Sequence, residues 1–131
     1  MTLVLDASVA FQAGISADGF AVFGRERLIA PPLLWPEVRS SLHAALWRRE
    51  ISPALARIAF ERVHTARISV RSPAGLATEA WRIADDFGWA KTYDAEYLAL
   101  ASLLHCRLVT VDEALRRASA RLGFVIRPTE L

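Results

Sequence analysis

Cysteine, lysine and long hydrophobic runs are scarce in this sequence. Cys106 is the only cysteine among 131 residues, so no disulfide can form within the chain, and we expect a reducing, cytoplasmic compartment. No apolar run approaches the roughly 20 residues that cross a bilayer, so no membrane association is expected. The first residues reach Asp6 without a preceding basic segment. They are therefore predicted to form a core strand and not a signal peptide.

Several common catalytic motifs are also missing. The three histidines, His43, His64 and His105, share no metal-ligand spacing, and His105 next to Cys106 resembles no known ligand pair. No glycine-rich phosphate loop is present, and no Gly-x-Ser-x-Gly elbow presents a nucleophilic serine. These absences argue against a zinc site, a P-loop nucleotide site and a serine hydrolase.

The sequence does have the size and apolar content of one folded domain. Hydrophobic residues make up 53% of the chain, enough for a real core, and no linker, repeat or low-complexity stretch divides it. Short apolar runs alternate with helical patterns, which predicts an α/β fold with a mostly parallel sheet. We therefore expect residues 1–131 to form a single three-layer α/β/α sandwich with about five strands.

The expected strands are short, and each is followed by a turn or helix signal. They lie at Leu3–Leu5, Leu28–Ala30, Ile68–Val70, Leu108–Val111 and Phe124–Ile126. Ser8 can help to turn the chain into a first short helix. Ser52-Pro53 and Ser72-Pro73 each resemble a helix cap followed by a first-turn proline. The further helices are expected from about Pro36 to Arg49, from Pro53, from Pro73 to Gly88, over 92–105, and up to Gly123.

Four acidic residues are predicted to meet at one edge of this sheet. Asp6 and Asp112 directly follow apolar strands, and Glu37 lies in the first turn of the helix after strand 28–30. Asp94 begins a helix that must run antiparallel to the strand that follows it, so its first turn lies at the same edge. Ligands of open parallel sheets bind at the carboxyl ends of the strands. The four carboxylates therefore predict a binding site.

Each acid also has an ordinary structural explanation. Asp6 and Asp112 could simply cap helices, and Glu37 and Asp94 could satisfy helix dipoles. Their convergence favours a site, because four carboxylates at one rim repel one another unless a cation neutralises them. All-oxygen ligands point to Mg²⁺ or Mn²⁺, ions that promote displacement at phosphodiesters.

The remaining charges suit a nucleic-acid substrate. Fifteen of the sixteen basic residues are arginine, whose guanidinium fits phosphate well, although a GC-rich genome would also explain this bias. With the four acids set aside, 16 basic residues face 10 acidic ones, although the whole chain carries a net charge of only +2. Such a surface would attract RNA and steer a phosphate toward the acidic pocket.

Over nearly its whole length, the sequence resembles the PIN-domain family and, within it, the VapC-type toxins of bacterial toxin–antitoxin pairs. The matching stretches are residues 3–9 (LVLDASV), 31–38 (PPLLWPEV), 92–95 (TYDA) with 98–101 (LALA), and 108–112 (LVTVD). The resemblance implies an Mg²⁺- or Mn²⁺-dependent endoribonuclease. It also implies a homodimer, held inactive by a cognate antitoxin whose C-terminal segment lies in the cleft.

The resemblance further suggests a role for each residue of the site. Asp6, Asp94 and Asp112 match metal ligands, and Glu37 would position or activate the attacking water or bind metal itself. Ser8 and Thr110 match small polar positions that orient the acids.

Two other functions remain open from the sequence. One is a catalytically silent PIN-fold module that binds RNA or protein, although a decayed site should have lost at least one acid. The other is phosphoryl transfer on small molecules, which usually needs a second aspartate where this chain has Ser8. Four tryptophans could stack on bases: Trp47 and Trp81 are expected in the core or an interface, and Trp89, like Lys91, could contact substrate.

Overall fold

All of residues 1–131 are described by the computed structural model, which is built around a five-stranded parallel sheet. The strands lie side by side in the order β3-β2-β1-β4-β5, and every neighbouring pair is parallel. This arrangement confirms the predicted α/β class and the number of strands. The bounds are β1 Thr2–Leu5, β2 Arg27–Ala30, β3 Ile68–Val70, β4 Arg107–Val109 and β5 Val125–Ile126.

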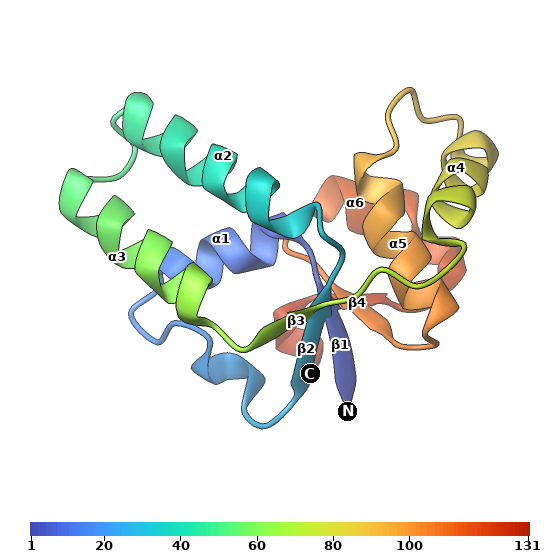
Figure 1. Ribbon diagram of the computed structural model, residues 1–131, viewed down its shortest axis with the longest axis horizontal. Coiled ribbons are helices and arrows are strands. Elements are labelled where there is room, and N and C mark those ends of the chain that lie inside the picture. The colour runs from blue at the N-terminus through green and yellow to red at the C-terminus, as the bar shows by residue number, and fades with distance from the viewer.

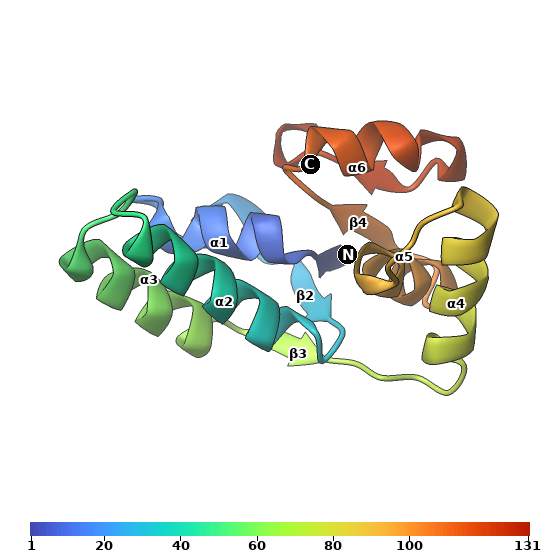
Figure 2. The ribbon, with the colours of Figure 1, turned by 90° about the horizontal axis from the view of Figure 1, so that it is seen from above.

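Helices cover both faces of the sheet, as a three-layer sandwich requires (Figures 1 and 2). On one side α1, α2 and α3 pack against one another, and on the other side α4 packs against α5. None of the helices combines the length and apolar character of a bilayer-spanning segment. The helices are α1 Ala7–Ile15, α2 Leu34–Trp47, α3 Pro53–Thr65, α4 Leu76–Phe87, α5 Tyr93–Leu103 and α6 Glu113–Ala118.

The central strands supply the core because both of their faces are covered. Leu3, Val4 and Leu5 of β1 and Leu108 of β4 are almost fully buried, which explains why these strands are continuous apolar runs without alternation. Residues 97–101 of α5 are buried as well and pack over this centre. The rigid centre of the molecule therefore fixes the strand ends that carry the acids.

The strand order reverses at β1. From β1 the chain builds outward through β2 to β3, and it then returns to place β4 and β5 on the other side of β1. In open α/β sheets, ligands bind in the crevice outside the carboxyl ends of the two strands at such a reversal. Here those strands are β1 and β4, which lead to Asp6 and Asp112.

Two predicted helix starts were wrong by a few residues. The helix predicted from Pro73 begins at Leu76, because Gly75 takes a left-handed conformation (φ 87°) that ends a short turn, and Ser72 caps nothing. Helix α2 begins at Leu34, two residues before the predicted start near Pro36. Pro36 still lies in the first turn, where its missing N–H leaves no hydrogen bond unmade.

Two of the tryptophans are more exposed than expected. Trp47 and Trp81 are 82% and 67% exposed, so neither lies in the core, and only the interface role remains. Trp89 is half-buried and stacks on Phe87, with 4.9 Å between ring centroids. One face of the Trp89 ring is therefore already covered by protein.

Candidate active site

Asp6 is a buried carboxylate at the end of β1, and only 5% of its surface is exposed. Its Oδ1 atom accepts hydrogen bonds from the Ser8 hydroxyl (2.6 Å) and the Val9 amide (3.0 Å). Its Oδ2 atom accepts one from the Thr110 hydroxyl at 2.5 Å. A carboxylate has about four acceptor positions, so this network leaves roughly one of them free, on Oδ2.

The two hydroxyls also connect Asp6 to the loop after β4. Ser8 Oγ accepts a hydrogen bond from the Val111 amide (3.2 Å), and Thr110 Oγ1 accepts one from the Asp112 amide (3.0 Å). These two amides bond to side chains instead of continuing the strand ladder. This explains why β4 ends at Val109, two residues earlier than predicted, and why Asp112 follows the strand after a short loop instead of directly.

Asp6 and Asp112 both cap helices, as their alternative explanation proposed. Asp6 accepts from the Val9 amide and caps α1, a function that the sequence analysis assigned in part to Ser8. Asp112 Oδ1 accepts from the Leu115 amide (3.1 Å) and caps the short helix α6. Asp112 nevertheless remains exposed, so its second oxygen is available to a ligand. Capping holds each carboxylate still without using all of its acceptor positions.

Glu37 reaches the site from helix α2, which belongs to the layer formed by α1, α2 and α3. It lies in the first turn of α2, is half-buried, and accepts a hydrogen bond on Oε1 from the Tyr97 hydroxyl at 2.6 Å. Tyr97 is only 1% exposed and lies in α5, three residues after Asp94. Tyr97 stands among leucines and alanines at helical spacing, and this local pattern gives no sign of the contact with Glu37.

Asp94 and Glu96 both lie in the first turn of α5. Asp94 is exposed and forms no hydrogen bond or ion pair within the protein, while Glu96 is half-buried. Glu96 was not among the predicted site residues, yet its charge reaches Glu37 and raises the pKa of that carboxyl. Its place two residues after Asp94, at the start of a helix, was the signal that could have identified it.

Burial and mutual repulsion raise the pKa of three of the four predicted acids. Burial is the main cause for Asp6, whose pKa rises although Ser8, Thr110 and Val9 stabilise its charged form. Burial also leads for Glu37, with added repulsion from Asp94 and Asp6, and for Asp94, with added repulsion from Asp112. The four charges therefore form one electrostatically connected group at the carboxyl edge of the sheet.

No basic side chain neutralises this group. The six ion pairs of the protein involve other carboxylates, namely Glu26, Glu50, Glu79, Asp86 and Glu113. At the same time, no three His, Cys, Asp or Glu side chains lie close enough together to hold a metal ion by themselves. The arrangement is thus rich in unneutralised negative charge, but it is not a ready-made cage of protein ligands.

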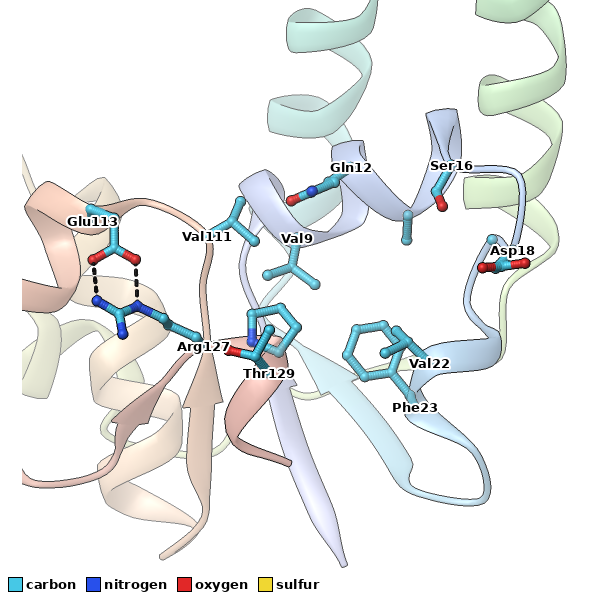
Figure 3. Close-up of a pocket in the computed structure, with 13 residues that line it drawn as sticks. Val9, Gln12, Ser16, Asp18, Val22, Phe23, Val111, Glu113, Arg127 and Thr129 are labelled. Carbon is cyan, nitrogen blue, oxygen red and sulfur yellow. Dashed lines mark hydrogen bonds and ion pairs between the residues drawn. The ribbon is translucent and has the colours of Figure 1, made fainter.

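Two hollows lie on either side of α1, and Val111 of the loop after β4 lines both. A groove of about 690 Å³ between α1 and α2 is lined by Ser8 and Glu37 at the acidic end and by Arg48 farther along α2. A second cavity, of about 540 Å³, lies on the other side of α1 (Figure 3). There Val9, Gln12 and Phe23 face Arg127, which is held by a double hydrogen bond to Glu113. The two hollows share Gln12 and Val111 in their linings.

Comparisons with known proteins point to one family. Residues 3–121 match the family model described as PIN domain. The chain is 34% identical over 112 residues to the VapC ribonuclease Mb0985 of Mycobacterium bovis and to the ribonuclease VapC9 of Mycobacterium tuberculosis. Each alignment covers 84% of this chain and 85% of the relative.

A solved structure agrees in fold. The protein PAE2754 from Pyrobaculum aerophilum superposes with a TM-score of 0.71, over 99% of this chain and 94% of that one. At 21% sequence identity, this likeness concerns the fold alone.

Proposed function

This chain belongs to the PIN-domain family and to its VapC ribonuclease group, and we propose that it is a divalent-metal-dependent endoribonuclease acting as the toxin of a toxin–antitoxin pair. The observation that carries the proposal is the group of connected, unneutralised carboxylates at the carboxyl ends of β1 and β4. In a relative of ribonucleases, that charge has a clear use. It would attract a cation that in turn binds a phosphodiester.

The donor chemistry of these residues fits Mg²⁺ or Mn²⁺. Only oxygen atoms are offered, burial and repulsion raise the pKa values of Asp6, Glu37 and Asp94, and no arginine or lysine pairs with these acids. Mg²⁺ characteristically keeps several waters and takes one or two carboxylates together with substrate phosphate oxygens. The lack of a three-carboxylate cage is therefore compatible with this ion.

Each site residue is assigned a role. Asp6, through the free position of Oδ2, and Asp94 would hold the cation, and Asp112 would complete the site through its uncommitted oxygen. A bound divalent cation supplies the positive charge that phosphodiester hydrolysis needs. Ser8 and Thr110 keep Asp6 in one orientation by donating to opposite oxygens. Glu37, with one oxygen free, would orient the attacking water and accept its proton.

The proposed partners are RNA, a cognate antitoxin and a second copy of this chain. The outer surfaces of α2 and α3 support a protein interface, because Trp47, Ile58 and Phe60 are all substantially exposed there. Large apolar side chains that remain exposed together usually mark binding surfaces. Sedimentation of the purified chain, alone and with its antitoxin, tests both assemblies. A dilute chain that stays monomeric in both conditions would contradict them.

RNA cleavage by purified protein tests the function. The wild-type chain, Asp6→Asn and Asp94→Asn would be incubated with structured RNAs in Mg²⁺ or Mn²⁺, with an EDTA control. Glu79→Gln serves as a matched control, because it removes a half-buried carboxylate that pairs with Arg82 and is not one of the acids of the site. We expect cleavage by wild type and Glu79→Gln, and loss of at least about 100-fold in the two aspartate variants and in EDTA.

Two outcomes would contradict the proposal. Cleavage that persists in both aspartate variants would exclude the proposed site. RNA binding without cleavage, by a folded wild-type protein across a broad set of RNAs, would favour the catalytically silent binding module instead.

A further inference from the structure

The hydrogen bond between Tyr97 and Glu37 has an unusual place in the fold. Glu37 belongs to α2 on one face of the sheet, and Tyr97 belongs to α5 on the other (Figure 2). It is the only side-chain hydrogen bond that joins the α1–α3 layer to the α4–α5 layer. The contact therefore spans the carboxyl edge of the sheet, where the acids lie.

Apart from the hydrogen bond with Tyr97, no hydrogen bond or ion pair holds the Glu37 carboxylate in this position. The negative charges of Asp94, Asp6 and Glu96 all act on it, and no basic group pairs with it. A glutamate side chain has several rotatable bonds, so repulsion alone would turn it toward solvent. The Tyr97 hydroxyl is the one protein donor that its carboxylate receives. That single bond holds Glu37 against the repulsion of three acids.

The direction of this hydrogen bond is fixed. The Tyr97 hydroxyl donates to Glu37 Oε1 at 2.6 Å, because a carboxylate oxygen is an acceptor and the phenol carries the proton. Oε1 is thereby occupied, while Oε2 has no protein donor. Glu37 lines the groove between α1 and α2 together with Ser8, so its side chain can be reached from that groove.

We propose that Tyr97 is a positioning residue for RNA cleavage, which holds Glu37 in the site so that its second oxygen can act on the attacking water. The proposal rests on the ribonuclease function above. It assigns no contact with substrate to Tyr97 itself. Helix α5 would then serve the site twice, because it carries Asp94 in its first turn and Tyr97 one turn further on.

Substitution of the hydroxyl tests this role. In Tyr97→Phe the ring keeps its packing, and we expect kcat to fall about 10- to 100-fold with KM changed less than about 3-fold, the usual effect of removing a supporting hydrogen bond in such a site. The matched control is Tyr93→Phe, the same chemical change four residues earlier in α5, where the side chain is 53% exposed and forms no hydrogen bond. This control should retain full activity.

A double-mutant cycle distinguishes positioning from structural support. If Tyr97 acts through Glu37, then Tyr97→Phe should lower the rate less than about 2-fold further in a Glu37→Gln background. A spectroscopic measurement adds a readout that needs no catalysis. The chain has two tyrosines, so Tyr93→Phe leaves Tyr97 alone, and its ¹³Cζ NMR signal should shift when Glu37 is changed to Gln.

The outcomes are separable. Wild-type activity in Tyr97→Phe, losses that multiply fully in the double variant, or an unmoved Tyr97 signal would each overturn the inference. If Tyr97→Phe fails to fold, the test rests on the NMR measurement, in which the ¹³Cζ signal of Tyr97 is compared between proteins with Glu37 and with Glu37→Gln. A folded wild-type chain that cleaves no RNA would instead contradict the proposed function, and with it this role.

Discussion

Asp6 serves two purposes that favour different side chains. Its hydrogen bonds cap α1 and connect β1 with the loop after β4, and an asparagine could supply most of the same acceptors. Its negative charge is a burden in the folded protein, because burial raises the pKa of the carboxyl. A charge that is retained at a cost to stability is expected where chemistry needs it.

Asp6→Asn should therefore separate stability from activity. We expect the free energy of unfolding in EDTA at pH 7 to stay unchanged or to rise by about 1 kcal/mol, because a buried charge is removed while the helix cap remains. Asp6→Ala is the comparison, and it should lose about 1–3 kcal/mol because the Val9 amide and two hydroxyls lose their acceptor. Urea unfolding measures both. Equal destabilisation of the two variants would show that the charge itself stabilises the fold.

Sequence patterns located the acids better than they located the groups around them. Asp6 and Asp112 could be predicted because apolar strands end close to them, and strand ends of a parallel sheet share an edge. The hydrogen bond of Tyr97 to Glu37 could not, because the two residues are 60 positions apart and belong to helices on opposite faces. Tyr97 at helical spacing among leucines and alanines looks like an ordinary core residue, since only its hydroxyl tip is polar.

At the level of elements, the position of α1 depends on its close packing with α3. Gly14 is the contact point: a Cβ atom built there would lie 3.1 Å from Val63 Cγ2 and 3.3 Å from the Ala59 carbonyl oxygen. Arg62 of α3 also donates hydrogen bonds to the Gly14 and Ser16 carbonyl oxygens at the end of α1. Because α1 starts at Asp6 and carries Ser8, this packing helps to set the geometry of the site.

Gly14→Val should force α1 away from α3. Three added carbon atoms meet backbone and a buried side chain, so we expect the free energy of unfolding to fall by about 2 kcal/mol or more. Ala77→Val is the control: it places the same β-branched side chain at an exposed position of α4, where the cost should be well under 1 kcal/mol. Thermal unfolding followed by circular dichroism compares them. Equal transition temperatures of Gly14→Val and Ala77→Val would mean that the contact between α1 and α3 accommodates a larger side chain without cost.

The five strands and six α-helices were predictable, but several boundaries and the three short 3₁₀ helices at 21–23, 120–122 and 128–130 were not. The starts of α2 and α4 depend on turns at Leu33 and Gly75, which local composition does not reveal. The end of β4 depends on contacts with Ser8, about a hundred residues away in sequence. The end of β4 is thus set by tertiary hydrogen bonds, whereas the apolar periodicity that identifies an element is local.

At the scale of the whole molecule, the group of acids should make stability depend on pH. The pKa values of Asp6, Glu37 and Asp94 are raised in the folded state, so the native protein binds more protons than the unfolded chain above the ordinary carboxyl range. Stability must then fall as pH rises through this window. Glu113 acts in the opposite sense, because its ion pair with Arg127 lowers its pKa to about 2, and its contribution is lost only in more acidic solution.

In EDTA, the free energy of unfolding should therefore increase as the pH is lowered from 7 to 5, and decrease again below about pH 4.5. Urea titrations across this range measure the slope. The double variant Asp6→Asn with Asp94→Asn should flatten the increase between pH 7 and 5, because two of the four carboxyls with raised pKa values are gone, while Glu37 and Glu96 remain. A slope that is unchanged in this variant would mean that other groups cause it.

Binding of Mn²⁺ to the RNA-free protein tests most directly the central claim that these acids form one cation site. Free Mn²⁺ would be measured by its electron paramagnetic resonance signal during titration of wild type, Asp6→Asn, Asp94→Asn and the control Glu79→Gln. We predict saturable binding in wild type and Glu79→Gln, displaced by excess Mg²⁺, with affinity lowered at least about 10-fold in each aspartate variant. Equal Mn²⁺ binding by all four proteins would contradict the site.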